Sequence, residues 1–304
     1  MKKSTGSRKV KTAVFISGTG SNLKNLIQFS LIKSSPILIN FVLSNSSNAK
    51  GLNFARKNKI KYKVFNFKNK NKDENQILFY LKKKKINLIC LAGFMKILSR
   101  NFIKKFKGKI LNIHPSLLPK YRGSSPVSAS ILNGDTMTGI SIMKLNSGID
   151  SGPILSQKEV AIAKNETCED LTTRLFSLSS KILIEVINKI EKGKITQKEQ
   201  CEKEATYTKK LSRLDGLINW ENSASEISNM IRAYHPWPGS YTVLNGRKLK
   251  IIESEFLISK HIKNIAPGEI FVDKEVFVGT SDGIIKLIKI QPEGKSAMNA
   301  KYMQ

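Results

Sequence analysis

The sequence predicts an α/β protein, with a doubly wound, mostly parallel sheet followed by a small antiparallel β domain of barrel-like type. Two observations lead to this prediction. From about residue 12 to 190, short apolar runs alternate with segments of helical periodicity, as buried parallel strands alternate with crossover helices. After about residue 207, short strand-like runs are joined by Asn-Gly and Asp-Gly, the strongest short signals for hairpin turns.

In the first region, four runs are short and almost continuously apolar, and we predict that each is a parallel strand: residues 12–17, 37–43, 86–92 and 109–114. A crossover helix is expected between the first two strands, because apolar residues recur there at helical spacing: Leu23, Leu26, Ile27 and Leu31. A longer helix is predicted over residues 168–191, where an apolar stripe is typical of ordinary core packing.

The apolar pattern stops over residues 191–206, which we predict to be an interdomain linker. It would separate a catalytic domain at residues 12–190 from a C-terminal β domain at residues 207–304, and residues 1–11 would form a basic tail. In the C-terminal domain a helix is expected over residues 224–234. The expected strands of this domain are residues 241–244, 248–252, 276–278 and 284–288, with turns at Asn245-Gly246 and Asp282-Gly283.

Composition narrows the possible classes of function. Of 304 residues, 52 are Lys or Arg and 23 are Asp or Glu, so the formal net charge is 52 − 23 = +29. An apolar fraction of 40% is enough to form hydrophobic cores, and it excludes a disordered basic chain. No run approaches the roughly 18 apolar residues of a membrane span. The apolar run behind the basic first residues is also too short for a secretory signal.

Cysteine content and charge bear on compartment and partners. The three scattered cysteines form no Cys-x-x-Cys pair, which argues against a disulfide framework or a zinc site and favours the reducing cytoplasm. The surplus of positive charge would attract nucleic acid or another polyphosphate, because neutralised phosphates release counterions. The alternative explanation of the positive charge is compositional drift, since the chain is also rich in Ile and Asn. Lysine-rich stretches at residues 68–72 and 82–85 are interpreted as solvated surface.

A glycine-containing loop at residues 17–22 follows the first predicted strand and precedes the first helix. Glycines allow backbone N–H groups to approach an anion, and the helix N-terminus adds partial positive charge. The loop is not a dinucleotide fingerprint, because the last position of that pattern, counted from Gly18, is Leu23. A monophosphate suits it better, with an ordinary tight turn as the alternative.

Three polar residues form a second candidate site. Asn112 and His114 lie two residues apart at the end of a predicted strand, so their side chains point to the same side. Asp150 lies in a glycine-flanked loop, which could aim its carboxylate into a site. An amide, an imidazole and a carboxylate suit acyl-type transfer to a substrate that brings its own nucleophile. The alternatives are a structural histidine and a turn aspartate. No metal-ligand pattern is apparent in the sequence.

These motifs resemble the folate-dependent formyltransferases, which have a Rossmann-like fold and use 10-formyltetrahydrofolate to formylate an amine. The resemblance rests first on residues 112–114, 116–119 and 148–150. Residues 12–121 are similar to glycinamide ribonucleotide (phosphoribosylglycinamide) formyltransferases, through residues 17–22, 44–51 and 91–98. From Tyr121 onward the chain is similar to methionyl-tRNA formyltransferases, through residues 121–126, 133–143, 205–211, 215–220, 231–239 and 291–295.

The resemblance implies a role for each of these motifs. Asn112 and His114 would stabilise the tetrahedral intermediate formed when the amine attacks the formyl carbon, with His114 as proton donor to the folate nitrogen. Asp150 would orient His114 or a bridging water. Two segments would bind 10-formyltetrahydrofolate: Ser116, Leu117, Leu118 and Pro119, and Met95, Lys96, Ile97 and Leu98. With a ribonucleotide substrate, Gly20, Ser21 and Asn22 would hold its phosphate. No metal is implied.

The resemblance therefore leaves two alternatives for the amine that accepts the formyl group. The C-terminal domain, the linker and the charge favour initiator methionyl-tRNA, formylated for translation initiation. The tRNA would contact basic residues of the linker, of residues 203–210 and 247–250, and Arg213 and Arg232. The 17–22 loop, and the lack of a long basic insertion after the second strand, favour a phosphoribosylglycinamide formyltransferase of purine biosynthesis with an added C-terminal domain.

A third interpretation is an RNA-binding protein with a vestigial transfer site, although the intact Asn112, His114 and Asp150 set argues against it. In either enzymatic case we expect a cytoplasmic monomer that does not contact a membrane.

Overall fold

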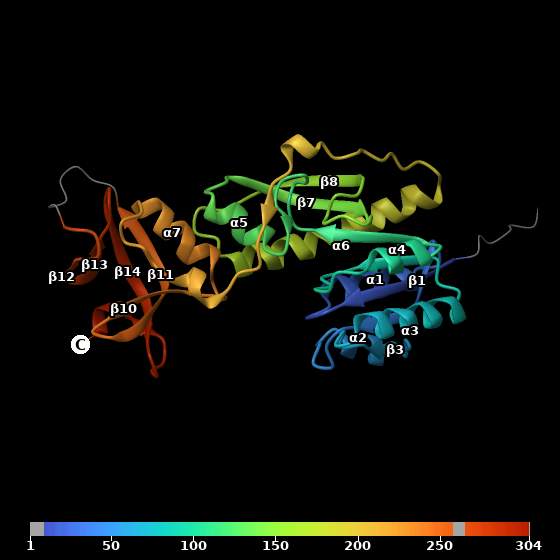
Figure 1. Ribbon diagram of the computed structural model, residues 1–304, viewed down its shortest axis with the longest axis horizontal. Helices are drawn as coiled ribbons and strands as arrows, with labels where there is room; N and C mark the ends of the chain where they lie inside the picture. Colours follow the sequence, from blue (N-terminus) through green and yellow to red (C-terminus); the bar gives the residue numbers. More distant parts are fainter. Residues whose placement is uncertain (1–8, 258–264, 304) are drawn as a thin grey trace, which may run out of the picture. The chain divides into compact units, whose positions relative to one another are not determined.

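The computed structural model describes residues 9–257 and 265–303, so most of the predicted basic tail lies outside the described residues. The chain forms two compact units that interleave along the sequence (Figure 1). The N-terminal unit comprises residues 1–122, 139–159 and 174–206, and the C-terminal unit comprises residues 123–138, 160–173 and 207–304.

A seven-stranded sheet forms the centre of the N-terminal unit, in the order β3-β2-β1-β4-β5-β7-β8. Strands β3, β2, β1, β4 and β5 run parallel to one another, and β7 runs antiparallel to β5. The strands are β1 (Val10–Ile16), β2 (Ile37–Ser44), β3 (Tyr62–Val64), β4 (Leu88–Leu91), β5 (Lys109–His114), β7 (Met137–Lys144) and β8 (Ile154–Ala161). The predicted doubly wound, mostly parallel sheet is therefore confirmed, although β1 begins two residues before the predicted start.

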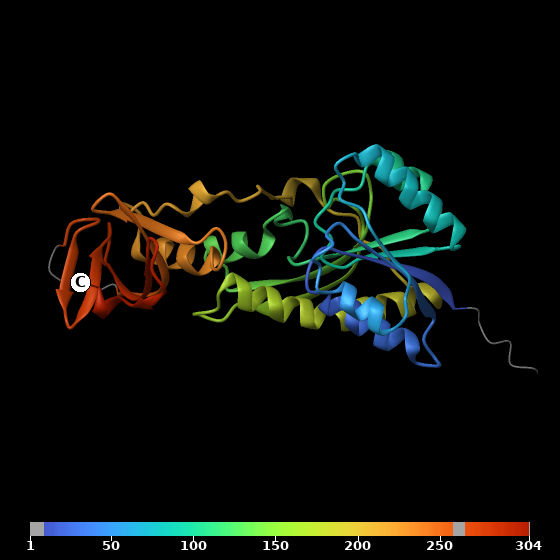
Figure 2. The same cartoon turned by 90° about the horizontal axis from the view of Figure 1, so that it is seen from below.

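Helices cover both faces of this sheet (Figure 2). The first face carries α3 (Lys70–Lys83) and α4 (Arg100–Lys105), and the second carries α1 (Ser21–Leu31) and α6 (Cys168–Glu191). The short helix α2 (Leu52–Lys57) also belongs to the N-terminal unit, whereas the short helix α5 (Pro126–Leu132) belongs to the C-terminal unit. The predicted helix over residues 168–191 is confirmed. The buried apolar stripe of α1 ends at Ile27, and the expectation that Leu31 belongs to it was wrong, since Leu31 is 71% exposed.

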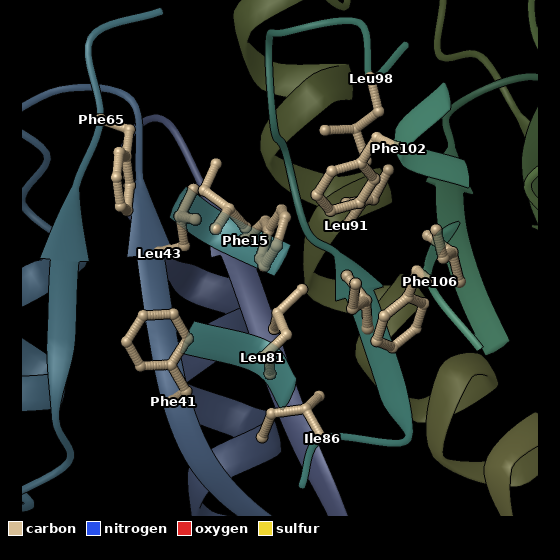
Figure 3. Close-up of a cluster of buried hydrophobic side chains, with 14 residues drawn as sticks. Phe15, Phe41, Leu43, Phe65, Leu81, Ile86, Leu91, Leu98, Phe102 and Phe106 are labelled. Carbon is tan, nitrogen blue, oxygen red and sulfur yellow. The ribbon is translucent and has the colours of Figure 1, made fainter. Parts of the chain in front are cut away.

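The core of the first face is built from alternate residues of the central strands (Figure 3). Phe15 of β1 and Phe41 and Leu43 of β2 pack against Leu81 of α3 and Phe102 of α4. Because side chains alternate along a strand, every second residue points to this face, and the residues between them point to the face covered by α1 and α6. Burial on both faces explains why the strands read as almost continuous apolar runs.

An antiparallel sheet of six strands forms the centre of the C-terminal unit, in the order β10-β11-β14-β13-β12, with β15 paired to β14. The strands are β10 (Ser240–Leu244), β11 (Arg247–Leu257), β12 (Ile270–Asp273), β13 (Glu275–Gly279), β14 (Ile284–Pro292) and β15 (Met298–Asn299). Helix α7 (Ala224–Ala233) contacts β11 and β14. Asn245 and Gly246 have φ of 50° and 73° and form the two-residue turn between β10 and β11, so the predicted Asn-Gly hairpin is confirmed.

Short elements join the larger ones. Strand β6 (Arg122–Gly123) pairs with β9 (Tyr207–Thr208) in a two-stranded ladder. Three 3-10 turns lie at Glu202–Glu204, Arg213–Gly216 and Ala300–Tyr302. Among the described helices, none has both the length and the hydrophobicity that crossing a membrane requires.

Candidate active site

Three polar side chains converge at the carboxyl end of β5 in the N-terminal unit. Asn112 and His114 lie on β5, and Asp150 lies in the loop that joins β7 to β8. Asn112 Nδ2 donates to Asp150 Oδ1 at 3.3 Å, and His114 Nδ1 lies 3.6 Å from Asp150 Oδ2. The structure therefore brings together the three predicted catalytic residues, and both strand residues point to the same side as expected. Their catalytic roles stay predictions.

The His114 ring has a defined hydrogen-bonding arrangement. Its side chain is only 4% exposed, and Nε2 lies 2.9 Å from the carbonyl oxygen of Tyr121. Because a carbonyl oxygen can only accept, Nε2 carries a hydrogen. Nδ1 is then the ring nitrogen that can gain or lose a proton, and this nitrogen faces Asp150.

The backbone of Asp150 is held in the left-handed region, with φ of 46°. This conformation is uncommon for a residue other than glycine and costs about 1–3 kcal/mol, so the surrounding loop must hold it in place. Asn146 Oδ1 accepts hydrogen bonds from Gly148 N at 3.0 Å and from Ser151 Oγ at 3.1 Å. At Gly152 a Cβ atom would lie 1.9 Å from the carbonyl oxygen of Lys144, so a larger residue could not occupy this position.

The predicted linker contributes directly to this loop. Gln200 Nε2 donates to the carbonyl oxygens of Asp150 and Gly152 at 2.8 and 2.7 Å. Gln200 Oε1 in turn accepts from Arg122 Nε at 3.0 Å. We call residues 198–206 the strap, because backbone hydrogen bonds also join Lys198 to Ile154 in β8. The strap therefore holds the Asp150 loop by a side-chain amide that bonds to two backbone carbonyl groups of the loop.

Arg122 connects the strap to the end of the predicted folate-binding loop. Its side chain is fully buried, and its two Nη atoms donate to the two carboxylate oxygens of Glu202 at 2.9 Å each. This bidentate pairing compensates for burying the guanidinium charge. Hydrogen bonds from Arg122 lower the pKa of Glu202, and they outweigh the opposing effect of desolvation.

The carbonyl group that holds His114 is itself fixed by the strap. Tyr121 has φ of 61°, and its backbone N donates to Thr206 Oγ1 at 2.8 Å. The next residue, Arg122, donates its backbone N to the carbonyl oxygen of Thr206 at 2.8 Å. Strap residues thus position both groups that flank the imidazole, the Tyr121 carbonyl on one side and the Asp150 carboxylate on the other.

The predicted folate-binding residues 116–119 form a tightly bonded loop. Ser116 and Leu118 are buried, and Ser116 Oγ donates to the carbonyl oxygen of Lys120 at 2.7 Å. Gln157 Nε2 donates to the carbonyl oxygen of Leu118 at 2.8 Å. Only Leu117 and Pro119 are partly exposed, so their side chains could contact a ligand, whereas Ser116 and Leu118 support the loop from within.

The other two predicted segments meet at the point where the strand order reverses, between β1 and β4. Open α/β sheets bind ligands at this switch point, outside the carboxyl ends of the strands. Ser17 N donates to the carbonyl oxygen of Gly93 at 3.1 Å, and Met95 N donates to Ser17 Oγ at 2.7 Å. Met95 and Ile97 are each 74% exposed and Lys96 is exposed, whereas Leu98 is buried.

The loop before α1 depends on close contact between two glycines. A Cβ atom on Gly20, whose φ is 76°, would lie 2.5 Å from the Cα of Gly51. Asn22 is only 3% exposed, and its Oδ1 accepts from Ser179 Oγ of α6 at 2.9 Å. The Asn22 carbonyl therefore has a structural partner, while Ser21 is exposed and Gly20 forms the helix N-cap. The phosphate-binding role of these three residues stays a prediction.

Sequence reasoning did not assign roles to Gln200, Thr206 or Arg122. Arg122 and Thr206 do belong to motifs that carry the resemblance, 121–126 and 205–211, and this was the available signal. Gln200 lies in a polar stretch with no pattern, so only the fold reveals its position. Among the described residues, no three His, Cys, Asp or Glu side chains are grouped as a metal site would require.

A doubly wound sheet brings an amide, an imidazole and a carboxylate together at its strand ends, with no hydroxyl or thiol nucleophile among the three. This arrangement is typical of a group-transfer enzyme whose acceptor supplies the nucleophile. The chain belongs to the formyl transferase family. Residues 10–187 match the family model for formyl transferase, and residues 210–304 match that for the formyl transferase C-terminal domain.

Three kinds of protein are among those similar to this chain. A methionyl-tRNA formyltransferase of Thermodesulfovibrio yellowstonii is 41% identical over 226 residues, which cover 73% of this chain and 72% of that protein. A phosphoribosylglycinamide formyltransferase of Anaplasma phagocytophilum superposes with a TM-score of 0.59 at 31% identity, over 66% of this chain and 97% of that one. HypX of Aquifex aeolicus, crystallised in complex with tetrahydrofolic acid, shares the fold with a TM-score of 0.64 at 14% identity, over 96% of this chain and 46% of that one.

Proposed function

We propose that this chain transfers the formyl group of 10-formyltetrahydrofolate to the amino group of methionyl-tRNA in the cytoplasm. The observation that carries this proposal is the match of residues 210–304 to the C-terminal domain of formyl transferases. The phosphoribosylglycinamide formyltransferase of Anaplasma phagocytophilum is covered to 97% by only 66% of this chain, which leaves about a third of this chain without a counterpart. The similarity to a methionyl-tRNA formyltransferase extends over 73% of the chain.

The chemistry of the site supports formyl transfer to an amine. Formyl folate supplies a carbonyl carbon that an amine can attack directly. Asn112 Nδ2 carries two hydrogens and gives one to Asp150 at 3.3 Å, so the other is free to stabilise an oxygen that gains negative charge. His114 holds or releases a proton at Nδ1, and Asp150 keeps that nitrogen oriented from 3.6 Å.

The exposed apolar side chains suit the folate co-substrate. Met95 and Ile97 are each 74% exposed beside the switch point, and Leu117 and Pro119 are partly exposed. Such a surface suits an aromatic ring system, because ligand pockets are largely apolar with a few polar groups that fix orientation. Lys96 would add charge toward an anionic group, but it lacks the paired donors of an arginine.

A second candidate, formylation of phosphoribosylglycinamide, is favoured by one observation. The close approach of Gly20 to Gly51 forms a compact turn at the N-terminus of α1, a helix of 11 residues, where a phosphate would meet backbone N–H groups. Because the Asn22 carbonyl is bonded to Ser179, the turn would bind a phosphate chiefly through its backbone.

A side-by-side assay with one formyl donor tests the two acceptors. Purified full-length protein is given formyl folate with either methionyl-tRNA, followed on acid-urea gels, or glycinamide ribonucleotide, followed by folate absorbance. We expect formyl-methionyl-tRNA to accumulate and His114→Ala to lower its rate by about 10²–10⁴-fold, the usual contribution of a general acid–base group. Turnover of glycinamide ribonucleotide alone would overturn the proposal.

A further inference from the structure

A lysine-lined cleft opens on the N-terminal unit away from the candidate active site. Its volume is about 640 Å³, and it lies between the segment that leads into β3 and the end of α3. Its lining includes Phe41 of β2 and Tyr62 and Lys63 of β3, which is the edge strand of the sheet. Strands β2, β1 and β4 separate β3 from β5, which carries Asn112 and His114, so the cleft is distinct from the candidate catalytic site.

Positive charge is concentrated in this cleft without local compensation. Its lining includes five lysines and, among the described residues, no Asp or Glu: Lys59, Lys61, Lys63, Lys83 and Lys84. Burial lowers the pKa of Lys84, and the nearby charges of Lys61 and Lys83 lower it further. A polyanion would relieve this repulsion.

Two of these lysines occupy positions where lysine is costly. Lys84 is half-buried, so its ammonium group is partly desolvated. Lys59 has φ of 54° after the end of α2, a position that glycine would adopt without strain. Lys84 in particular keeps an ammonium group where it is partly desolvated, unlike a lysine on a fully solvated surface.

Aromatic side chains lie beside the lysines. Lys63 Nζ is 5.4 Å from the centre of the Tyr80 ring, and Arg56 Cζ is 5.3 Å from that of Tyr62. Phe79, next to Tyr80, is 62% exposed. Proteins that bind single-stranded nucleic acid combine a positive groove for the backbone with aromatic surfaces on which bases stack.

We propose that this cleft binds the phosphodiester backbone of a single-stranded RNA segment. Several separate ammonium groups on flexible stems suit a row of phosphates, whereas one small phosphate is usually held by an arginine fork or by clustered backbone N–H groups. The proposal does not depend on the acceptor amine, because it concerns the cleft beside the edge strand β3 and RNA that carries no amino acid.

The test measures the salt dependence of RNA binding by full-length protein. The probe is a fluorescein-labelled, 12-nucleotide oligouridylate, and its anisotropy is followed from 50 to 300 mM NaCl. The triple variant Lys59→Gln/Lys61→Gln/Lys63→Gln removes three exposed cleft lysines. We expect the slope of log K against log[NaCl] to become shallower by about 2, since each contact to a single strand contributes about 0.7. Binding at 50 mM NaCl should weaken on the order of tenfold or more.

A charge-matched control distinguishes binding of RNA at the cleft from diffuse electrostatic attraction of RNA to the whole protein surface. Lys181→Gln/Lys189→Gln/Lys192→Gln removes three exposed lysines on and just after α6, so both variants have a net charge of 29 − 3 = +26. This control should change the slope by less than about 0.5. Equal losses in both variants would show that the charge acts diffusely and would overturn the proposal.

Two further measurements complete the test. Inorganic tripolyphosphate, compared at equal ionic strength, should displace the RNA only weakly. If tripolyphosphate displaced the RNA with an affinity equal to that of the RNA, and this affinity depended on the cleft lysines, the cleft would be a site for small polyphosphates. That result would overturn the RNA assignment. If the triple variant does not fold, Lys63→Gln alone should reduce the slope by about 0.7, and an unchanged slope would contradict the proposal.

Discussion

Two glutamines support the candidate site in the same chemical way but at different loops. Gln200 donates its amide hydrogens to the carbonyl groups of Asp150 and Gly152, and Gln157 donates to that of Leu118. Gln200→Ala should lower kcat about 10–100-fold with little change in KM for formyl folate, because a misplaced Asp150 no longer orients His114. Steady-state kinetics with varied formyl folate would measure this effect.

Gln157→Ala is the matched control for this prediction. It removes support from the 116–119 loop, so KM for formyl folate should rise while kcat changes less. If both variants changed kcat and KM alike, Gln200 would be a structural residue and not a positioning residue.

At the scale of elements, four of the described helices end in the same backbone motif with different residues. In α2, α3, α5 and α6 the left-handed position is occupied by Lys59, Lys85, Gly134 and Gly193, with φ of 54°, 54°, 70° and 66°. In each case two backbone N–H groups bond back into the last turn, as in a Schellman motif. Lys85→Gly should therefore raise the free energy of unfolding by about 0.5–1 kcal/mol, because glycine adopts this conformation without strain.

Urea denaturation of the full-length protein would measure this difference. Gly193→Ala is the opposite control and should lower the free energy of unfolding by about 1 kcal/mol. No atom lies within 4 Å of a Cβ at Gly193, so its cost would be conformational and not steric. A destabilised Lys85→Gly variant would mean that the lysine side chain contributes more than the strain removes.

Prediction from sequence succeeded where one element is buried on both faces. Strand β5 has the predicted bounds, because its apolar residues Ile110, Leu111 and Ile113 are all buried between neighbouring layers. Helix α3 was not predicted, since only Glu74, Ile77 and Leu81 are buried on it and lysines surround them. Strand β3 has three residues, of which Lys63 and Val64 are exposed, so it carries no apolar signal.

The candidate site was predictable to a different extent. Asn112 and His114 share a strand, and their common direction follows from the alternation of side chains. The contact between Arg122 and Gln200 joins residues 78 positions apart in sequence, and no local pattern encodes it. Buried arginine is rare, so a composition-based analysis assigns Arg122 to the surface, whereas the structure buries it fully.

At the scale of the whole molecule, a net charge of +29 makes stability sensitive to acid and salt together. Several carboxylates have a pKa lowered by hydrogen bonds: that of Asp215 by Lys209 and then by Ser212, that of Glu202 by Arg122, and that of Glu226 by Ser223. A lowered pKa means that the folded state binds fewer protons than the unfolded state. Their stabilisation is thus present above the ordinary values of 3.8 and 4.5, and it is lost as pH falls below them.

Acidification also removes negative charge, so the net charge rises from +29 toward 52 + 3 = +55 and self-repulsion increases. We therefore expect the thermal midpoint to fall steeply below about pH 4.5 in 10 mM NaCl and less steeply in 150 mM, where the Debye length shortens from about 30 Å to about 8 Å. Differential scanning fluorimetry across pH and salt would measure both slopes. Glu202→Gln should have a lower midpoint at neutral pH but a shallower acid dependence, because it has no carboxylate to protonate. Equal acid slopes at the two salt concentrations would show that the +29 charge has no part in stability.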